Sequence, residues 1–336
     1  MIARPPYATV LKPYGTALVE LAKQRPEVVC LSADLTRQCE VDLFRDVIPE
    51  RFVNVGMAEQ NLMGIAGALA REGFIPFVHS FGVFCTRRPY DQVAMAIAYP
   101  DLPVRLIGFM PGLSSPGGPS HQAIDDVALM RALPNMTVVD VADAVETSQV
   151  VPAIADLPGP AYLRLKRGEI PVVFDAADHV LDLGSAQVLL RGGDVAVIAG
   201  GMMLPAAIVA ADVLAQHGVE ASVLNVPVVK PLDATTVLDA CASARGVVVA
   251  ENHSVIGGLG SAVAEALAEA GLGRPLRRVG VRDVFAGGAR TAGYLFDRHA
   301  LSTQAVIDAA WSLTASPGPP PPAPPPSAQP GAYAPV

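Results

Sequence analysis

Charged and aromatic side chains are scarce in this sequence. Of 336 residues, 17% are charged and 5% are aromatic, whereas 51% are hydrophobic. So high an apolar content excludes an intrinsically disordered chain and allows sizeable cores. The net charge is −8 and the basic residues form no cluster, so we expect no nucleic-acid partner.

Cysteine is equally rare. Cys30, Cys39, Cys85 and Cys241 show neither a disulfide framework nor the spacing of a zinc site. We therefore expect buried free thiols, no metal ligands in this chain, and a reducing, cytoplasmic location.

Long apolar segments are also missing. The first fifteen residues, MIARPPYATVLKPYG, contain no continuous apolar core, which excludes a signal peptide. The longest uncharged run, 195–211, is interrupted by Gly200, Gly201 and Pro205 and is shorter than the roughly 20 apolar residues of a membrane span. These features predict a soluble protein with no membrane partner.

Short β-rich runs alternate with helical patterns along the chain. This alternation predicts an α/β fold of two domains, each a mainly parallel sheet with helices on both faces. The expected strands are 27–32, 52–55, 75–80, 104–109, 137–141 and 161–165 in the first half, and 195–199, 221–228, 246–250 and 276–281 in the second. The expected helices include 15–23, 59–71, 90–99 and 124–133, followed by 204–217, 234–242, 260–270 and 303–313.

The acidic, irregular stretch VVFDAADHVLDLG interrupts the alternation and marks a linker. We place the first domain at 1–175, the linker at 176–184 and the second domain at 185–315. The tail, 316–336, is about half proline and is expected to be polyproline II-like or disordered.

The stretch RFVNVGMAEQNLMG places Glu59 where a strand gives way to a helix. A carboxylate there is either a helix-start residue, favoured by the helix dipole, or a group tuned for proton transfer. Small neighbours such as Gly56 and Ala58 would let a flat ligand approach closely. The stretch alone leaves both interpretations open.

Two later segments add candidate site residues. In SFGVFCTRRPYDQ, Phe81 and Phe84 are either core residues or a wall for an aromatic ligand. Arg88 follows in a pair of arginines, for which a solvated surface position is the alternative to a role in the site. The long loop GFMPGLSSPGGPSHQAIDD carries His121 after the carboxyl end of a parallel strand, where α/β sheets bind ligands. His121 could orient an oxyanion or serve as an acid or base.

Two further segments could bind anions. YLRLKRGE places Arg164, Lys166 and Arg167 at a strand end, where a solvated surface is the equal alternative. ENHSVIGGLG joins Glu251 and His253 to a glycine-rich turn into a helix, whose N-terminus could receive an anion.

These motifs, in this order, resemble the C-terminal half of the transketolases, which are thiamine-diphosphate enzymes. The series GMAEQNLMGIAGALA, PFVHSFGVF, RRPYDQV, GPSHQ, DVALMRALPNM and ENHSVIGGLG lies within a match from about residue 14 to residue 313. The resemblance implies a pyrimidine-binding domain followed by a transketolase C-terminal domain.

The resemblance also implies roles for cofactor-binding residues. Glu59 matches the glutamate that hydrogen-bonds N1′ of the aminopyrimidine, where a carboxyl in a dry site can share a proton with the ring and so promote the ylide nucleophile. Phe81 and Phe84 match the aromatic residues packed on that ring. Asp34 matches an aspartate near the cofactor, and Met57 is expected to be a further cofactor-binding residue.

On the substrate side, His121 matches the histidine next to the reacting carbonyl, a catalytic and substrate-binding position. Arg167 matches an arginine that binds the substrate phosphate, and Arg88 is expected to contact substrate as well.

The diphosphate half of the cofactor site has no counterpart in this sequence. Transketolases hold Mg²⁺ and the diphosphate with a GDG-plus-Asn motif, and the nearest string here, GGDV at 192–195, falls in the other domain. The resemblance therefore implies one subunit of a split transketolase. Its partner would supply the diphosphate and Mg²⁺ site in an α2β2 assembly, and both domains of this chain would self-associate.

Departures from the family pattern bear on the substrate. The loop before His121 reads SSPGG, with no acid near Gly117 to read a donor hydroxyl. Family phosphate contacts fall at about Leu11, Gln38 and Met110, although Lys12 is adjacent to the first. Each lost charge-assisted contact weakens binding by about 1.5–3 kcal/mol, so we expect an unusual donor or acceptor.

The expected activity is transfer of a two-carbon ketol unit between sugars or sugar phosphates. The alternatives are the β subunit of a 2-oxo acid dehydrogenase E1 component, a pyruvate condensation like that of 1-deoxyxylulose-phosphate synthase, and a non-enzymatic assembly subunit that docks through its tail.

Overall fold

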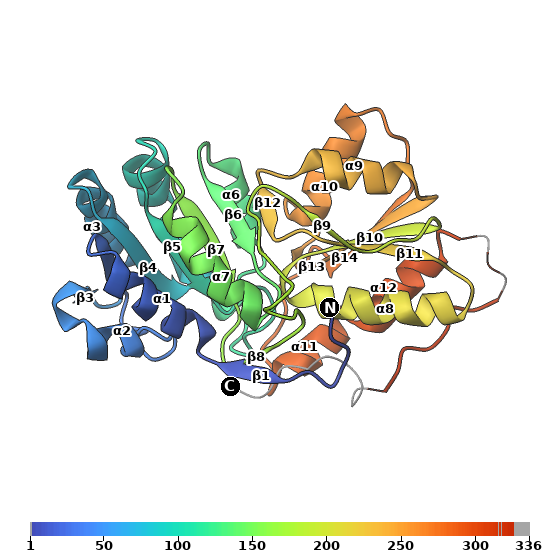
Figure 1. Ribbon diagram of the computed structural model, residues 1–336, viewed down its shortest axis with the longest axis horizontal. Coiled ribbons are helices and arrows are strands. Elements are labelled where there is room, and N and C mark those ends of the chain that lie inside the picture. Colours follow the sequence, from blue (N-terminus) through green and yellow to red (C-terminus); the bar gives the residue numbers. More distant parts are fainter. Residues whose placement is uncertain (1, 315, 317, 326–336) are drawn as a thin grey trace.

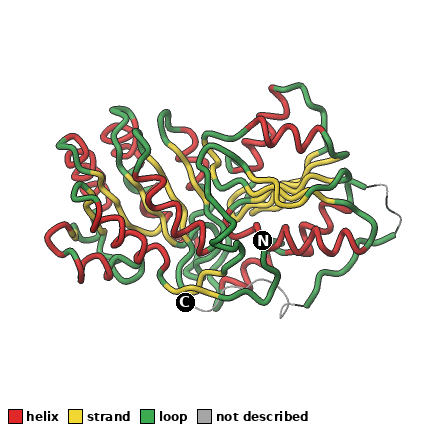
Figure 2. Tube along the Cα trace, in the orientation of Figure 1, coloured by secondary structure: helices red, strands yellow, loops and turns green. Residues whose placement is uncertain are grey.

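Two sheets of mostly parallel strands organise the chain. The computed structural model describes residues 2–314, 316 and 318–325, and shows two α/β domains side by side (Figure 1). The strands appear in yellow in Figure 2, with red helices packed on either side of each sheet. The predicted fold class is confirmed.

The first half of the chain contributes eight strands and its helices. The strands are β1 (Thr9–Leu11), β2 (Val28–Ser32), β3 (Phe52–Asn54), β4 (Ile75–Phe81), β5 (Arg105–Phe109), β6 (Thr137–Asp140), β7 (Ala161–Leu165) and β8 (Glu169–Pro171). The helices are α1 (Pro13–Gln24), α2 (Asp42–Val47), η1 (Pro49–Arg51), α3 (Glu59–Arg71), α4 (Gly82–Thr86), α5 (Tyr90–Gln92), η2 (Val93–Ala98), η3 (Pro119–His121), α6 (Asp126–Ala132) and α7 (Ala144–Ala155).

The second half continues the alternation. Its strands are β9 (Gln187–Leu190), β10 (Val195–Ala199), β11 (Ala221–Asn225), β12 (Val228–Lys230), β13 (Gly246–Ser254) and β14 (Leu276–Val281). Its helices are η4 (Gly201–Met203), α8 (Leu204–Gln216), α9 (Ala234–Ala242), α10 (Leu259–Glu269), α11 (Ala292–Arg298) and α12 (Thr303–Trp311).

The larger sheet has seven strands in the order β12-β6-β7-β5-β4-β2-β3. All neighbours are parallel except β12 and β6. The central strands β2, β4, β5 and β7 are buried along their whole length, as strands covered by helices on both faces must be. Their carboxyl ends therefore share one edge of the sheet.

The strand expected at 221–228 is wrong as a single element. The structure divides it into β11, which lies in the second sheet, and β12, which pairs antiparallel with β6 of the first. Pro227 lies at the division and has no backbone N–H to continue a ladder, while its carbonyl accepts from the N–H of Asp140 at 2.8 Å. The second half thus completes the edge of the first domain's sheet.

The smaller sheet has the order β14-β13-β10-β11-β9, with β9 antiparallel. The sequence patterns did not indicate β9, nor the two-stranded sheet formed by β1 and β8. The expected helix over 90–99 is present as α5 followed by the π-helical turns of η2.

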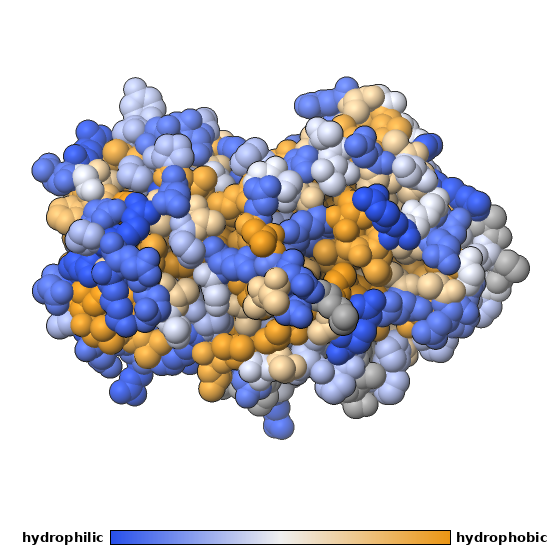
Figure 3. Space-filling view, in the orientation of Figure 1, coloured by the Kyte–Doolittle hydropathy of each residue, from blue (hydrophilic) through white to orange (hydrophobic). Residues whose placement is uncertain are grey.

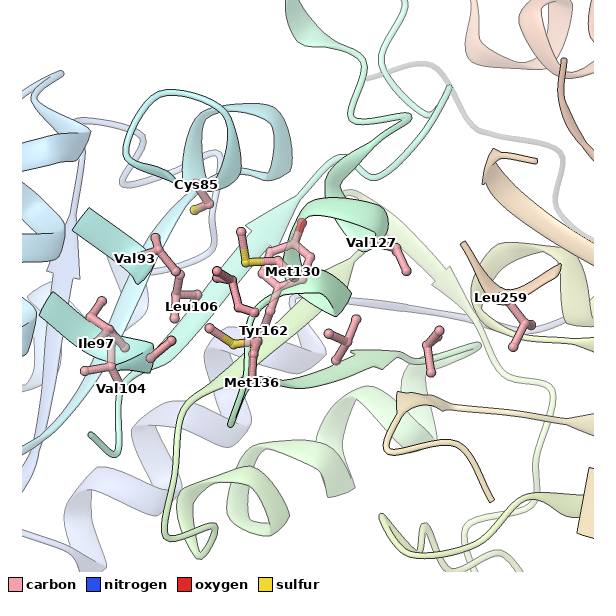
Figure 4. Packing of buried hydrophobic residues seen from close by; sticks show 14 of the residues in the cluster. Cys85, Val93, Ile97, Val104, Leu106, Val127, Met130, Met136, Tyr162 and Leu259 are labelled. Carbon is pink, nitrogen blue, oxygen red and sulfur yellow. The ribbon is translucent and has the colours of Figure 1, made fainter. Parts of the chain in front are cut away.

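One hydrophobic cluster continues from the first domain into the second. Figure 4 shows Met130, Met136 and Tyr162 of the first domain packed in this cluster, which reaches Leu259 at the start of α10. The cluster also includes Val247 and other buried residues of the second sheet. Because the two domains share this core, their relative position is fixed by packing.

The surface mixes polar and apolar side chains. Figure 3 shows charged groups over much of this face, with apolar atoms gathered near β9 and around β1, where Val10 and Leu11 are exposed. In the described part of the chain, no helix is both long and apolar enough to cross a bilayer. All four cysteines are free and buried, as expected.

Part of the proline-rich tail lies against α12. The indole N–H of Trp311 donates to the Gly318 carbonyl at 3.0 Å, and the Gln304 side chain accepts from the Ala323 N–H at 2.6 Å. Ala323 also packs against the second domain's core, so this part of the expected polyproline II-like or disordered tail contacts the folded domain. Residues 317 and 326–336 of the predicted tail lie outside the described residues.

Glu40 generates a prediction about stability. Its carboxylate is buried and accepts the Gly15 N–H at 3.0 Å, and burial raises its pKa to about 7. The native chain therefore holds a proton that the unfolded chain releases between about pH 4.5 and 7, so this group's contribution to stability is complete below that range and is lost as pH rises through it.

We expect Glu40→Gln to become more stable relative to wild type as pH rises from 5 to 8, by on the order of 1–3 kcal/mol. Urea unfolding at the two pH values measures this. Glu20→Gln, at an exposed position on α1, is the control and should show no such trend. Parallel pH profiles for wild type and Glu40→Gln would contradict the prediction.

Candidate active site

Glu59 is the first residue of α3 and is 4% exposed. Gly56, with φ of 74°, turns the chain between β3 and this helix. Glu59 is therefore a helix-start residue, as one of the two interpretations expects, but Ala58 is the N-cap residue and no side chain caps the helix. The Glu59 Oε1 accepts a hydrogen bond from Arg88 Nη1 at 3.0 Å.

Phe81 and Phe84 lie on either side of the junction between β4 and α4. Their rings stack with centroids 6.0 Å apart and an interplanar angle of 25°. Phe81 is buried, while Phe84 is half-buried. The Arg88 guanidinium lies 3.9 Å from the Phe84 ring centroid, a cation–π contact. Arg88 therefore links the aromatic pair to Glu59.

His121 joins this group from a distant part of the sequence. It ends η3 and packs edge-on against Phe84 and Phe81, with ring centroids 5.2 and 6.3 Å away. Its Nδ1 is 3.0 Å from the Ser120 hydroxyl, and the side chain remains half-buried. The structure thus brings together Glu59, Phe81, Phe84, Arg88 and His121.

Asp34 approaches the same group through a short polar chain. It is exposed, with φ of 63°, and its Oδ1 accepts from Asn54 Nδ2 at 3.1 Å. The Asn54 Oδ1 in turn accepts the Gly56 N–H at 3.0 Å. Asp34 therefore helps to fix the turn that leads to Glu59.

A surface hollow of about 460 Å³ opens beside Glu59, between the start of α3 and Arg88. Met57, which is 78% exposed, lies on its rim. Its lining is Met57, Ala58, Glu59, Gln60, Asn61 and Arg88. The predicted position of Met57 next to the site is consistent with this geometry.

In the part of the chain that the structure describes, the remaining substrate candidate, Arg167, shows no contact with this group of side chains. It is half-buried in the connection from β7 to β8, and no hydrogen bond or ring contact joins it to Glu59 or His121 within the described residues. Its proposed phosphate role remains a prediction. Lys12, next to the position of another family phosphate contact, forms an ion pair with Asp42 at 2.6 Å.

Arg164 does not belong to an anion site or to a solvated strand end. It is 1% exposed and is held by two carboxylates, with Nε donating to Asp126 at 2.8 Å and Nη1 donating to Asp140 at 2.6 Å. Both expectations for its side chain are therefore wrong. The only signal in the sequence for this burial was the presence of two acids, Asp126 and Asp140, and both lie far from Arg164 along the chain.

The helix N-terminus in ENHSVIGGLG is already occupied by a buried carboxyl group of the same chain. The Glu251 carboxylate accepts the N–H groups of Leu259 at 2.7 Å and Gly260 at 3.0 Å, at the start of α10. His253 is buried, and its Nδ1 lies 2.7 Å from the Ser254 carbonyl. Burial lowers the pKa of His253 to about 4, so it is neutral at pH 7. The free anion site expected here is absent.

Comparisons with known proteins agree with this arrangement. Residues 7–172 match the transketolase pyrimidine-binding domain, and residues 184–306 match the transketolase C-terminal domain. A transketolase family protein of Sinorhizobium fredii is 45% identical over 300 residues, which cover 88% of this chain and 86% of that protein. The chain belongs to the transketolase family.

Two further transketolase relatives are similar over nearly their whole length. A 6-deoxy-6-sulfo-D-fructose transketolase subunit of a Clostridium species is 42% identical, with 90% of this chain and 93% of that protein covered. A solved split-gene transketolase, described as an inactive β4 tetramer, superposes with a TM-score of 0.83 at 41% identity, covering 90% and 97% of the two chains.

Membership of the transketolase family implies dependence on thiamine diphosphate. The residues beside the hollow fit the pyrimidine part of that cofactor, because they combine a buried carboxylate with an aromatic pair. Within the described residues, no group of three or more His, Cys, Asp or Glu side chains could hold a metal ion.

The ion pair between Arg88 and Glu59 generates a second prediction. The Glu59 side chain is 5% exposed, so removing Arg88 leaves a buried carboxylate without its cation. We expect Arg88→Ala to destabilise the chain at pH 8 and Glu59→Gln to relieve that loss. Because half of the Arg88 side chain is exposed to screening water, the expected coupling is about 1 kcal/mol.

A double-mutant cycle by urea unfolding measures this coupling. The control is Arg45→Ala, whose partner Asp46 is 63% exposed and needs no buried counter-charge. Strict additivity of the Arg88 and Glu59 substitutions would show that the pair is not energetically coupled.

Proposed function

We propose that this chain is the pyrimidine-binding subunit of a split transketolase that transfers a two-carbon ketol unit between sugars. The observation that carries this proposal is the meeting of Glu59, Phe81, Phe84 and His121 at one surface hollow. These residues come from three separate connections at the carboxyl edge of the first sheet, where α/β proteins place their chemistry.

Each of these residues has a role in the proposal. The bound cofactor supplies the carbon nucleophile that carries the two-carbon unit. The buried carboxyl group of Glu59 would exchange a proton with N1′ of the pyrimidine when the cofactor is bound. Phe81 and Phe84 form an apolar wall beside the ring. His121 donates a hydrogen bond to the oxygen of the reacting carbonyl.

A partner chain would complete the site. The hollow is open to solvent, and its rim includes the exposed Met57 and Arg88, so a second protein surface can cover it. The sequence lacks the GDG-plus-Asn motif, so the diphosphate and Mg²⁺ would lie on that partner. The similar split-gene chain, described as inactive when assembled as β4, supports an α2β2 enzyme.

The donor is proposed to differ from an ordinary sugar phosphate. Met110 is buried where the family places a phosphate-binding histidine, and Lys12 already pairs with Asp42. The similar Clostridium subunit is named for a sulfosugar, 6-deoxy-6-sulfo-D-fructose. A sulfonate carries one negative charge where a phosphate carries nearly two, and it needs fewer cationic contacts.

A second candidate is condensation of pyruvate with an aldehyde. A 1-deoxy-D-xylulose-5-phosphate synthase of Synechococcus is 36% identical over 82% of this chain, although the match covers 43% of that enzyme. The altered loop before His121 favours neither donor by itself. Product analysis with pyruvate in place of a ketose distinguishes the two activities.

Reconstitution with a partner provides the test of function. We expect no thiamine-diphosphate-dependent product from this chain alone, and turnover when it is co-expressed with a chain that carries GDG and a downstream Asn. Activity from the isolated chain would contradict the split-subunit proposal.

In the reconstituted enzyme, Glu59→Gln should lower kcat at least 100-fold, because an amide cannot exchange a proton with the ring nitrogen. The matched control is Glu72→Gln, an exposed carboxylate at the other end of α3, which should keep wild-type kcat. Thermal unfolding of both variants checks folding. Near-wild-type turnover by Glu59→Gln would remove Glu59 from its proposed role.

Donor specificity gives a further prediction. We expect kcat/KM for xylulose 5-phosphate to be on the order of 10-fold or more below that for 6-deoxy-6-sulfo-D-fructose, since one lost charge-assisted contact costs about 1.5–3 kcal/mol. Steady-state kinetics with a common aldose acceptor measures the ratio. Equal or higher efficiency with xylulose 5-phosphate would defeat the proposal of an unusual donor.

A further inference from the structure

The segment 110–123 connects β5 to the start of α6 and carries His121; we term it the His121 loop. Its backbone is held partly by itself, since the Gly112 N–H donates to the Ala123 carbonyl at 2.9 Å. Four further hydrogen bonds join the loop to Asn252, Gly287 and Ala289 of the second domain. From the first domain, Arg87 donates to the Pro119 and Gln122 carbonyls. The position of His121 thus depends on both domains.

Asn252, in β13 of the second domain, holds the first residues of the His121 loop. Its Nδ2 donates to the Pro111 carbonyl at 3.0 Å, and its Oδ1 accepts the Leu113 N–H at 2.9 Å. The side chain is buried, with 2% of the residue exposed. Both ends of one amide therefore satisfy backbone groups that would otherwise be buried without a partner.

Gly112 is the residue that this arrangement requires between Pro111 and Leu113. Its φ is 55°, and an added Cβ would lie 2.2 Å from the Asn252 side-chain oxygen. Arg164 also holds Asn252, because its Nη2 donates to the Asn252 carbonyl at 3.0 Å. The close fit between Gly112 and Asn252 therefore leaves no room for a side chain at position 112.

The far part of the His121 loop is held by backbone groups of the second domain. The Ala289 N–H donates to the Pro116 carbonyl at 3.0 Å, and Gln122 Nε2 donates to the Gly287 carbonyl at 3.3 Å. These bonds hold the loop at Pro116 and at Gln122, which directly follows His121. Arg87 of the first domain holds the Pro119 and Gln122 carbonyls at 3.3 and 3.2 Å. With Asn252, they attach the loop at its beginning, middle and end.

We infer that Asn252 is a positioning residue: it fixes the His121 loop so that the imidazole stays against Phe84 in a productive orientation. The inference rests on the proposed function for its catalytic consequence, but not for the loop geometry itself. A displacement of about 1 Å in a reacting group can lower turnover about 100-fold. Removing the amide frees two backbone groups and lets the beginning of the loop move.

The first test uses the isolated chain and hydrogen exchange. Asn252→Ala should accelerate exchange of the amides of 112–123 at least 10-fold, because the Leu113 N–H loses its acceptor. Asn225→Ala is the matched control: this buried asparagine of the second domain bonds to Glu146 at 2.6 Å, away from the loop. Exchange in 112–123 should be unchanged in the control.

The second test uses the reconstituted enzyme. Asn252→Ala should lower kcat by about 10- to 100-fold while the concentration of thiamine diphosphate needed for half-maximal activity changes less than 3-fold. Asn225→Ala should keep kcat within 3-fold of wild type, even if its thermal unfolding temperature falls as far as that of Asn252→Ala. Asn252→Asp, which keeps the acceptor for Leu113 but loses the donor to Pro111, should lie between.

The outcomes separate this inference from the proposed function. If wild-type enzyme proves inactive, the proposed function fails, and the exchange measurement alone decides whether Asn252 positions the loop. Should Asn252→Ala fail to fold, the same two measurements on Asn252→Asp decide the matter. Unchanged exchange in 112–123, or equal loss of kcat in the Asn252 and Asn225 variants, would overturn the inference.

Discussion

The Arg164 guanidinium joins three parts of the structure on which the rest depends. It binds Asp126 at the start of α6, Asp140 at the end of β6, and the backbone of Asn252 in the second domain. Burial of so large a cation is tolerated because two carboxylates and two backbone carbonyls surround it. Loss of the guanidinium would leave two buried carboxylates without their cation, so Arg164 fixes the two domains and the His121 loop together.

The candidate site shares the His121 loop with this network, since Arg164 Nη2 also donates to the Ala123 carbonyl at 3.4 Å. Glu59 begins α3, Phe84 lies in α4 and His121 ends η3, all at connections on the carboxyl edge of the first sheet. Glu59 is buried beside a single cation, Arg88, which also covers Phe84. The carboxylate, the aromatic wall and the cation therefore act as one unit whose open side faces solvent.

Local pattern was sufficient for the buried elements. The expected ranges for β7, β10, β14, α3 and α9 agree with the structure residue for residue, because continuous apolar runs and helical periodicity are local properties. It was insufficient for β1, β8, β9 and β12, which have three or four residues each and gain their stability from a distant partner strand. Among the site residues, the sequence indicated Arg88, but it could not predict the hydrogen bond between Arg88 and Glu59.

By itself the sequence determined the fold class, the order of the family motifs and the chemical identity of Glu59, Phe81, Phe84 and His121. Only the tertiary structure decided which charges meet. It buried Arg164 between two acids, placed Glu251 on the helix N-terminus expected to be free, and set Asn252 under the His121 loop. Buried polar groups pair with groups from segments that are distant in the sequence. Periodicity is a local property of the chain, so it cannot predict which distant segments meet.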